Sequence, residues 1–209
     1  MVGISPAPAQ RPPRPAPSSA LLQPVFLLLA LAAILIWTGI GSIRIRRWTR
    51  PVIVALSSVM LPLIHLGLSR RPRTRGRVVH LLLLYALVLD VGVIGLPLGF
   101  IPHVFFPDQA AELIGWPPGS PFQLEVGFHD GAWGLLGFLC IWIGGLFWLA
   151  TGLGWSFFML GATYGHIRET VIREDYAPYN FFTMFSDGFI GIWILVLLYL
   201  YYRQGGFQK

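Results

Sequence analysis

Long apolar runs, separated by short clusters of arginine, proline and glycine, dominate the pattern of this chain. An α-helix needs about 20 apolar residues to cross the roughly 30 Å hydrocarbon core of a bilayer. Six runs approach or reach that length, and each predicts a membrane-spanning helix: residues 21–43, 52–68, 78–101, 121–143, 146–165 and 181–202. The run 52–68 is short and has arginines on both sides, so it either spans the membrane or lies in its interface.

These runs divide the chain into four parts. Residues 1–20 hold six prolines and few large apolar side chains, which predicts a disordered cytoplasmic tail. Residues 21–77 predict one or two N-terminal membrane helices with arginine-rich loops, residues 78–203 a four-helix membrane domain, and residues 204–209 a C-terminal tail. The expected fold class is therefore all-α, a polytopic transmembrane bundle of about six spans.

The composition agrees with this expectation. Hydrophobic residues make up 55% of the chain and charged residues 11%, against about 25% charged residues in a soluble domain. This excludes a soluble enzyme, and the single cysteine excludes a disulfide scaffold. The expected partner is the lipid bilayer, joined by other membrane proteins or a second copy of the chain, and not nucleic acid. The sequence contains no nucleotide-binding loop and no catalytic-triad spacing, so neither motif favours an enzyme.

Arginine and lysine set the predicted orientation. With six spans, nine basic residues fall on the side of the two termini and six on the other side. Cytoplasmic loops of membrane proteins carry the excess of basic residues. We therefore predict a multi-pass protein of the inner cell membrane with both termini in the cytoplasm.

Polar residues at the helix ends predict where several helices begin. Ser120 to Gln123 reads as a capping box at the start of the fourth run. Asn180 is the predicted N-cap of the last run, and Asp108 that of a short amphipathic helix ending at Ile114, before Gly115.

Glycines predict the helix contacts. Gly144 and Gly145 leave almost no loop between the fourth and fifth runs, which predicts an antiparallel hairpin. The GxxxG stripes 127–131 and 161–165 would then face one another and bring the two helices into close contact.

Ionisable side chains inside a bilayer are costly and by default indicate function. If each of the last four runs crosses the membrane once, six such groups gather in the leaflet opposite the termini: His103, Glu125, His129, His166, Glu169 and Asp187. Asp90 and Asp130 lie deeper, and Asp130 is the expected partner of Asp90.

Two kinds of site are compatible with this cluster. One is a pocket for a proton or a small polar ligand, lined by His103, Glu125, His166, Glu169 and Asp187, with Trp116 and residues 108–114 as its lid. The other is a metal site of Glu125, His129, His166 and Glu169 for iron, manganese or zinc, although the sequence requires no cofactor. Haem is not favoured, because His129 and His166 differ in depth by about 10 Å.

The alternative is a structural role. The same groups would then form a hydrogen-bond network that locks helices together, with Arg168 or Arg173 neutralising carboxylates. The chain would in that case be an accessory or structural subunit of a larger membrane complex.

Several short sequence motifs carry a family resemblance. These are HVFFPD at 103–108, AELIGW at 111–116, SPFQLEVG at 120–127, GHI at 165–167 and APYN at 177–180, followed by Asp187. Between about Val78 and Arg203 the chain resembles a DUF6790-like family of small prokaryotic multi-pass membrane proteins of unknown function. Its architecture is also loosely similar to that of DoxX-type membrane proteins. The resemblance implies a compact four-helix membrane arrangement and brings no established activity.

Overall fold

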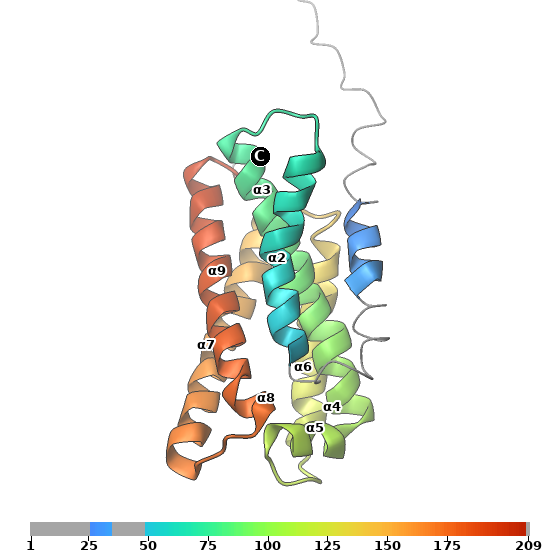
Figure 1. Cartoon of the computed structure of the whole chain (residues 1–209), viewed down its shortest axis with the longest axis vertical. Coiled ribbons are helices and arrows are strands. Elements are labelled where there is room, and N and C mark those ends of the chain that lie inside the picture. Colours follow the sequence, from blue (N-terminus) through green and yellow to red (C-terminus); the bar gives the residue numbers. More distant parts are fainter. Residues whose placement is uncertain (1–25, 35–48, 208–209) are drawn as a thin grey trace, which may run out of the picture.

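The computed structural model describes residues 26–34 and 49–207, and within these residues it is all helical (Figure 1). Residues 26–34 form one helical segment. The other helices are α2 (Thr49–Leu68), α3 (Arg75–Ala86), η2 (Leu87–Phe100), α4 (Ile101–Phe105), α5 (Pro107–Ile114), α6 (Phe122–Leu139), α7 (Leu146–Arg173), α8 (Pro178–Phe181) and α9 (Thr183–Arg203). The predicted all-α bundle is confirmed.

Four helical segments of the described chain are long and apolar enough to cross a membrane: Thr49–Leu68, Arg75–Phe105, Leu146–Arg173 and Pro178–Arg203. They correspond to four of the six predicted spans, including the short run 52–68. The protein is therefore a membrane protein.

The other two predicted spans are not among these four segments. The fourth predicted run forms α6, an 18-residue helix, but Gln123, Glu125, His129 and Asp130 make it less apolar than the four segments above. That α6 crosses the membrane stays a prediction. Of the first predicted run, 21–43, only residues 26–34 are described, and the predicted tail 1–20 lies outside the described residues.

Glycines bring η2 and α6 into backbone contact. A Cβ atom added at Gly95 of η2 would lie 2.6 Å from the backbone oxygen of Asp130 in α6. One added at Gly134 of α6 would lie 2.9 Å from the carbonyl carbon of Gly95. Real Cβ atoms do not approach other atoms this closely, so the two helices touch along a line where only glycine fits. This contact makes η2 and α6 the first tightly packed pair of the bundle.

The helices α7 and α9 form the second tightly packed pair. Gly152 of α7 lies against Ile194 and Leu198 of α9, and Gly191 of α9 lies against Leu160 of α7. Small residues on both helices thus permit the close approach, as is common between membrane helices.

The predicted contact between the two GxxxG stripes is wrong. Gly127 lies against α4 and Gly131 against Phe100 of η2, so this stripe of α6 faces η2 and α4 instead of α7. A Cβ atom at Gly161 or Gly165 would have no neighbour within 4 Å. Although the turn at Gly144 and Gly145 joins α6 to α7, these helices make few contacts, because each packs against a different partner.

The helix η2 has π-type hydrogen bonding over 14 residues, whereas π-helices elsewhere are mostly single turns. It contains Asp90, which is fully buried. Neither oxygen of its carboxyl has a hydrogen-bond partner among the described residues, although Ser58 of α2 lies beside it. The predicted partnership with Asp130 is wrong, because Asp130 lies against Gly99, nine residues further along η2.

The predicted caps are partly corrected. The Ser120 hydroxyl accepts a hydrogen bond from the Phe122 amide at 3.3 Å, but the side chain of Gln123 turns to His103 instead of completing a capping box. Asp108 lies inside α5 and accepts a hydrogen bond from the Gly119 amide at 3.1 Å. Gly115 ends α5 at a φ of 90°, as its place after the apolar residues predicts.

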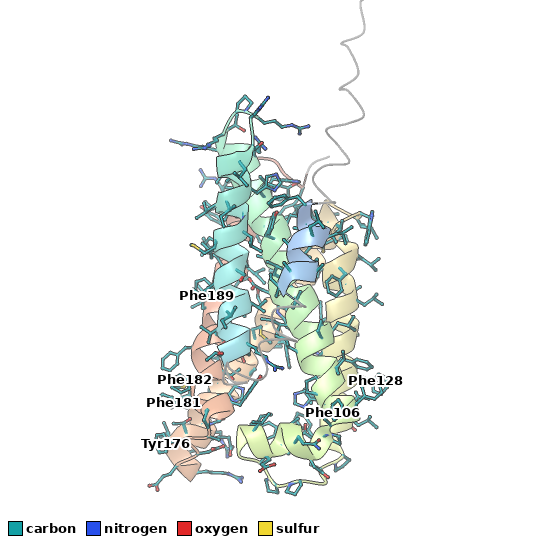
Figure 2. The ribbon with its side chains drawn as sticks, turned by 45° about the vertical axis from the view of Figure 1, so that its right-hand side comes forward. Phe106, Phe128, Tyr176, Phe181, Phe182 and Phe189 are labelled. Carbon is teal, nitrogen blue, oxygen red and sulfur yellow. The ribbon has the colours of Figure 1, made fainter. Side chains whose placement is uncertain are left out.

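The two ends of the bundle differ in charge. One end holds the arginine-rich turn between α2 and α3 and the end of α9 (Figure 1). The opposite end, here the α5/α8 end, holds α4, α5, α8, the start of α6 and the end of α7. Exposed aromatic side chains project from both flanks near the α5/α8 end, among them Phe106, Phe128, Tyr176 and Phe182 (Figure 2). Of these residue types, tyrosine is typical of the boundary between bilayer and water.

Candidate functional site

A cavity of about 620 Å³ lies between the two tightly packed helix pairs, toward the α5/α8 end. Its walls are mostly apolar and aromatic, with residues from η2, α6, α7 and α9. Five histidine and aspartate side chains also line it: His103, His129, Asp130, His166 and Asp187. A large apolar cavity with a few convergent polar groups is the usual form of a ligand site.

Asn180 determines how His166 is oriented. The buried Asn180 amide nitrogen donates hydrogen bonds to the Asp175 carbonyl at 2.8 Å and to the Thr170 hydroxyl at 2.9 Å. Because a backbone carbonyl only accepts, the amide oxygen of Asn180 must be the atom that faces His166 Nδ1, at 2.7 Å. The Nδ1 atom of His166 therefore carries a proton and donates a hydrogen bond to the amide oxygen of Asn180.

This orientation directs the other ring nitrogen of His166 toward α9. Its Nε2 atom lies 3.8 Å from Oδ2 of Asp187, and both side chains are largely buried. That separation is longer than a direct hydrogen bond. The pair therefore presents an imidazole nitrogen and a carboxyl group side by side in the cavity wall, each with capacity for a further partner.

A second histidine–aspartate pair lines the cavity from α6. The Trp133 indole N–H donates to Nε2 of His129 at 3.0 Å, which leaves Nδ1 of His129 to donate to Asp130 at 3.3 Å. The His129 ring packs on Phe158 of α7 with 4.2 Å between ring centres. Asp130 lies close enough to Asp187 for the two carboxylates to repel each other when both are ionised.

His103 lies where the cavity meets α4 and α5. Its Nδ1 atom is 2.5 Å from the side-chain oxygen of Gln123, a buried residue in the first turn of α6. Ile114 at the end of α5 and Trp116 also line the cavity. The segment predicted as a lid is thus next to the cavity, and its opening and closing stay a prediction.

Two residues of the predicted pocket do not line the cavity. Glu125 is exposed on α6. Glu169 forms ion pairs with Arg168 at 3.0 Å and with Arg173 at 3.1 Å, near the end of α7. The structural alternative predicts that Arg168 or Arg173 neutralises carboxylates, and the ion pairs of Glu169 with both arginines fit it.

The four predicted metal ligands do not come together. In the part of the chain that the structure describes, no three His, Cys, Asp or Glu side chains are placed to hold one metal ion. Of the predicted set, His129 and His166 line the cavity, while Glu125 and Glu169 lie outside it. We therefore base no function on a metal.

The sequence reasoning missed Asn180 and Gln123 as partners of histidines. It assigned both residues to helix ends, yet Asn180 lies inside α8 and Gln123 is buried against α4. A signal was present: each amide stands at a predicted helix entrance, at the same depth as a histidine on a neighbouring helix.

No curated protein and no solved structure matches this chain. One family model does, over residues 49–206, which includes α2 as well as the four-helix region in which the resemblance was noted. Because the match covers well over half of the chain, the protein belongs to this family, described as a family of unknown function (DUF6790).

Proposed function

We propose that this membrane protein binds a small, largely apolar ligand in the cavity between its helix pairs. The ligand would carry one hydrogen-bonding group, which meets His166 and Asp187. The observation that carries the proposal is the orientation of His166 by Asn180, because it holds an imidazole nitrogen beside a carboxyl group without bonding the two directly.

The His166–Asp187 pair suits a ligand that accepts or donates a proton. With Nδ1 of His166 engaged by Asn180, either Nε2 of His166 or the carboxyl of Asp187 can hold a proton. When the carboxyl holds this proton, the pair offers an acidic donor beside a basic nitrogen. When Nε2 holds it, the pair is an imidazolium beside a carboxylate.

The wall formed by α7 leaves room for entry. Gly161 and Gly165 line the cavity and carry no side chain, and the space beside them is open for at least 4 Å. Because α6 and α7 make few contacts, a lipid-soluble molecule would enter between these helices from the bilayer.

Mass spectrometry of lipophilic molecules that co-purify with the protein tests the proposal. Gly161→Phe fills the cavity from a position with open space, so we expect the variant to fold and to lose the co-purifying molecule. Gly67→Phe is the matched control, because Gly67 of α2 also has no neighbour within 4 Å but does not line the cavity. Equal retention by both variants, or no molecule with the unmodified protein, would contradict the proposal.

Asp187→Asn separates ligand binding from a structural role. The change keeps the shape of the side chain and removes its acid. The proposal predicts loss of the co-purifying molecule with little change in the thermal midpoint. A lower midpoint with the molecule retained would instead favour the helix-locking alternative.

A further inference from the structure

A second cavity, of about 520 Å³, adjoins the first at the α5/α8 end. The two share four lining residues, Leu98, His103, Ile114 and Tyr179. The second cavity lies against α4 and α5, and most of its wall is hydrocarbon from proline, leucine, isoleucine and phenylalanine side chains.

Arg50, in the first turn of α2, is the one permanently charged side chain in the described wall of this cavity. It is partly buried. All nine acidic residues of the chain lie within the described segments, and none of them forms an ion pair with Arg50. Charged groups removed from water are normally paired. The unpaired, partly buried guanidinium of Arg50 beside an apolar wall is therefore suited to bind an anion from outside the described chain.

The position of the cavity indicates where that anion comes from. Phe106 lines the cavity near the α5/α8 end, where the exposed Tyr176 is of a residue type typical of the bilayer boundary (Figure 2). A headgroup at this depth would meet Arg50 while its hydrocarbon chain follows the apolar wall. Arginine binds carboxylate and phosphate groups through two parallel hydrogen bonds.

We infer that the second cavity binds a single-chain anionic amphiphile, with its carboxylate or phosphate headgroup on Arg50 and its chain against α4 and α5. This site is separate from His166 and Asp187, and the inference does not rest on the function proposed for the first cavity.

Equilibrium binding of radiolabelled dodecanoate and dodecyl phosphate tests the inference, with the full chain in nanodiscs of neutral phosphatidylcholine and empty nanodiscs as background. Dodecanol and dodecyltrimethylammonium have the same chain length without a negative charge. We expect at least one anion to bind tenfold or more tightly than either of them. Tight binding of only one anion identifies the headgroup as carboxylate or phosphate, and tight binding of both identifies their shared charge.

Two variants connect this binding to Arg50. Arg50→Gln removes a charge that has no partner, so we expect the protein to fold and the anion to bind at least tenfold more weakly. Arg168→Gln is the matched control, because Arg168 is an exposed arginine paired with Glu169, and it should bind the anion like the unmodified protein. Gly161→Phe fills only the first cavity and should also leave anion binding unchanged.

A third variant keeps the inference testable if Arg50→Gln does not fold. Leu113→Trp fills the second cavity from α5 and leaves Arg50 in place, and it should weaken anion binding by a similar factor. If neither dodecanoate nor dodecyl phosphate binds more tightly than dodecanol, the inference is overturned. Full anion binding by Arg50→Gln, or by Leu113→Trp where Arg50→Gln does not fold, would overturn it as well.

Discussion

The contact between η2 and α6 yields the sharpest prediction about packing. Alanine at Gly134 would place a methyl group 2.8 Å from Cβ of Leu96 and 2.9 Å from the carbonyl carbon of Gly95, and closer still to the Leu96 amide nitrogen. Two of these three neighbours are backbone atoms, so no side-chain rotation relieves the overlap. The helices must separate, and the cavity wall must shift with them.

The magnitude follows from two opposing effects. Overpacking of a filled interior costs about 1–3 kcal/mol, and rigid backbone neighbours place Gly134→Ala near the upper limit. Alanine is better than glycine in a helix by about 1 kcal/mol. The net loss is then about 2 kcal/mol, or roughly 4–8 °C in the thermal midpoint of a chain of this size.

Gly161→Ala is the matched control, since its methyl group meets no atom within 4 Å. It keeps the gain in helix propensity and should raise the midpoint by about 2–4 °C. Thermal unfolding of both variants in the same detergent, followed by circular dichroism, compares them directly. A Gly134→Ala protein as stable as Gly161→Ala would refute the backbone contact between η2 and α6.

Two further predictions concern buried polar groups. Asn180→Ala leaves the Asp175 carbonyl, the Thr170 hydroxyl and Nδ1 of His166 with one partner fewer each. Unfolding in detergent should then show a free energy of unfolding lower by about 1–3 kcal/mol. An unchanged free energy of unfolding would mean that the network does not form. Asp90→Val removes a buried carboxyl without hydrogen-bond partners in the described chain. It should raise the thermal midpoint by an amount equivalent to about 1–3 kcal/mol. A lowered thermal midpoint would show that Asp90 has a stabilising partner.

The membrane helices were predictable because their signal is local. An apolar run of sufficient length predicts a spanning helix without knowledge of its neighbours, and α2 and α9 begin and end within three residues of their predicted limits. The helix α7 continues eight residues past its predicted end, through Arg173. Length in apolar residues says nothing about the polar turns beyond the membrane, which the Glu169–Arg173 pair helps to stabilise.

The rotation of each helix was not predictable in the same way. Gly127 and Gly161 both belong to small-residue stripes, and only the three-dimensional packing shows that the first is buried and the second open. Likewise Glu125 and His129 share a helix face by spacing, yet Glu125 is exposed while His129 lines the cavity. Residues four positions apart share a helix face, but this spacing does not determine which of them points to a neighbouring helix.

The candidate site was predictable in part. If each of the last four runs crosses the membrane once, His103, His166 and Asp187 lie at the same end of the bundle. All three line the cavity. The role of Asn180 was not predictable, because its partners come from residues 5 to 14 positions earlier and meet only when the turn before α8 folds back on α7.

The orientation of His166 is the claim on which the proposed site depends most directly. Nitrogen-15 NMR of histidine-labelled protein in lipid, with His166→Gln to assign the signal, measures which ring nitrogen carries the proton. The account predicts a protonated Nδ1 in the unmodified protein, whether the ring is neutral or charged, and loss of this preference in Asn180→Ala. A neutral His166 with its proton on Nε2 and a bare Nδ1 would contradict the account.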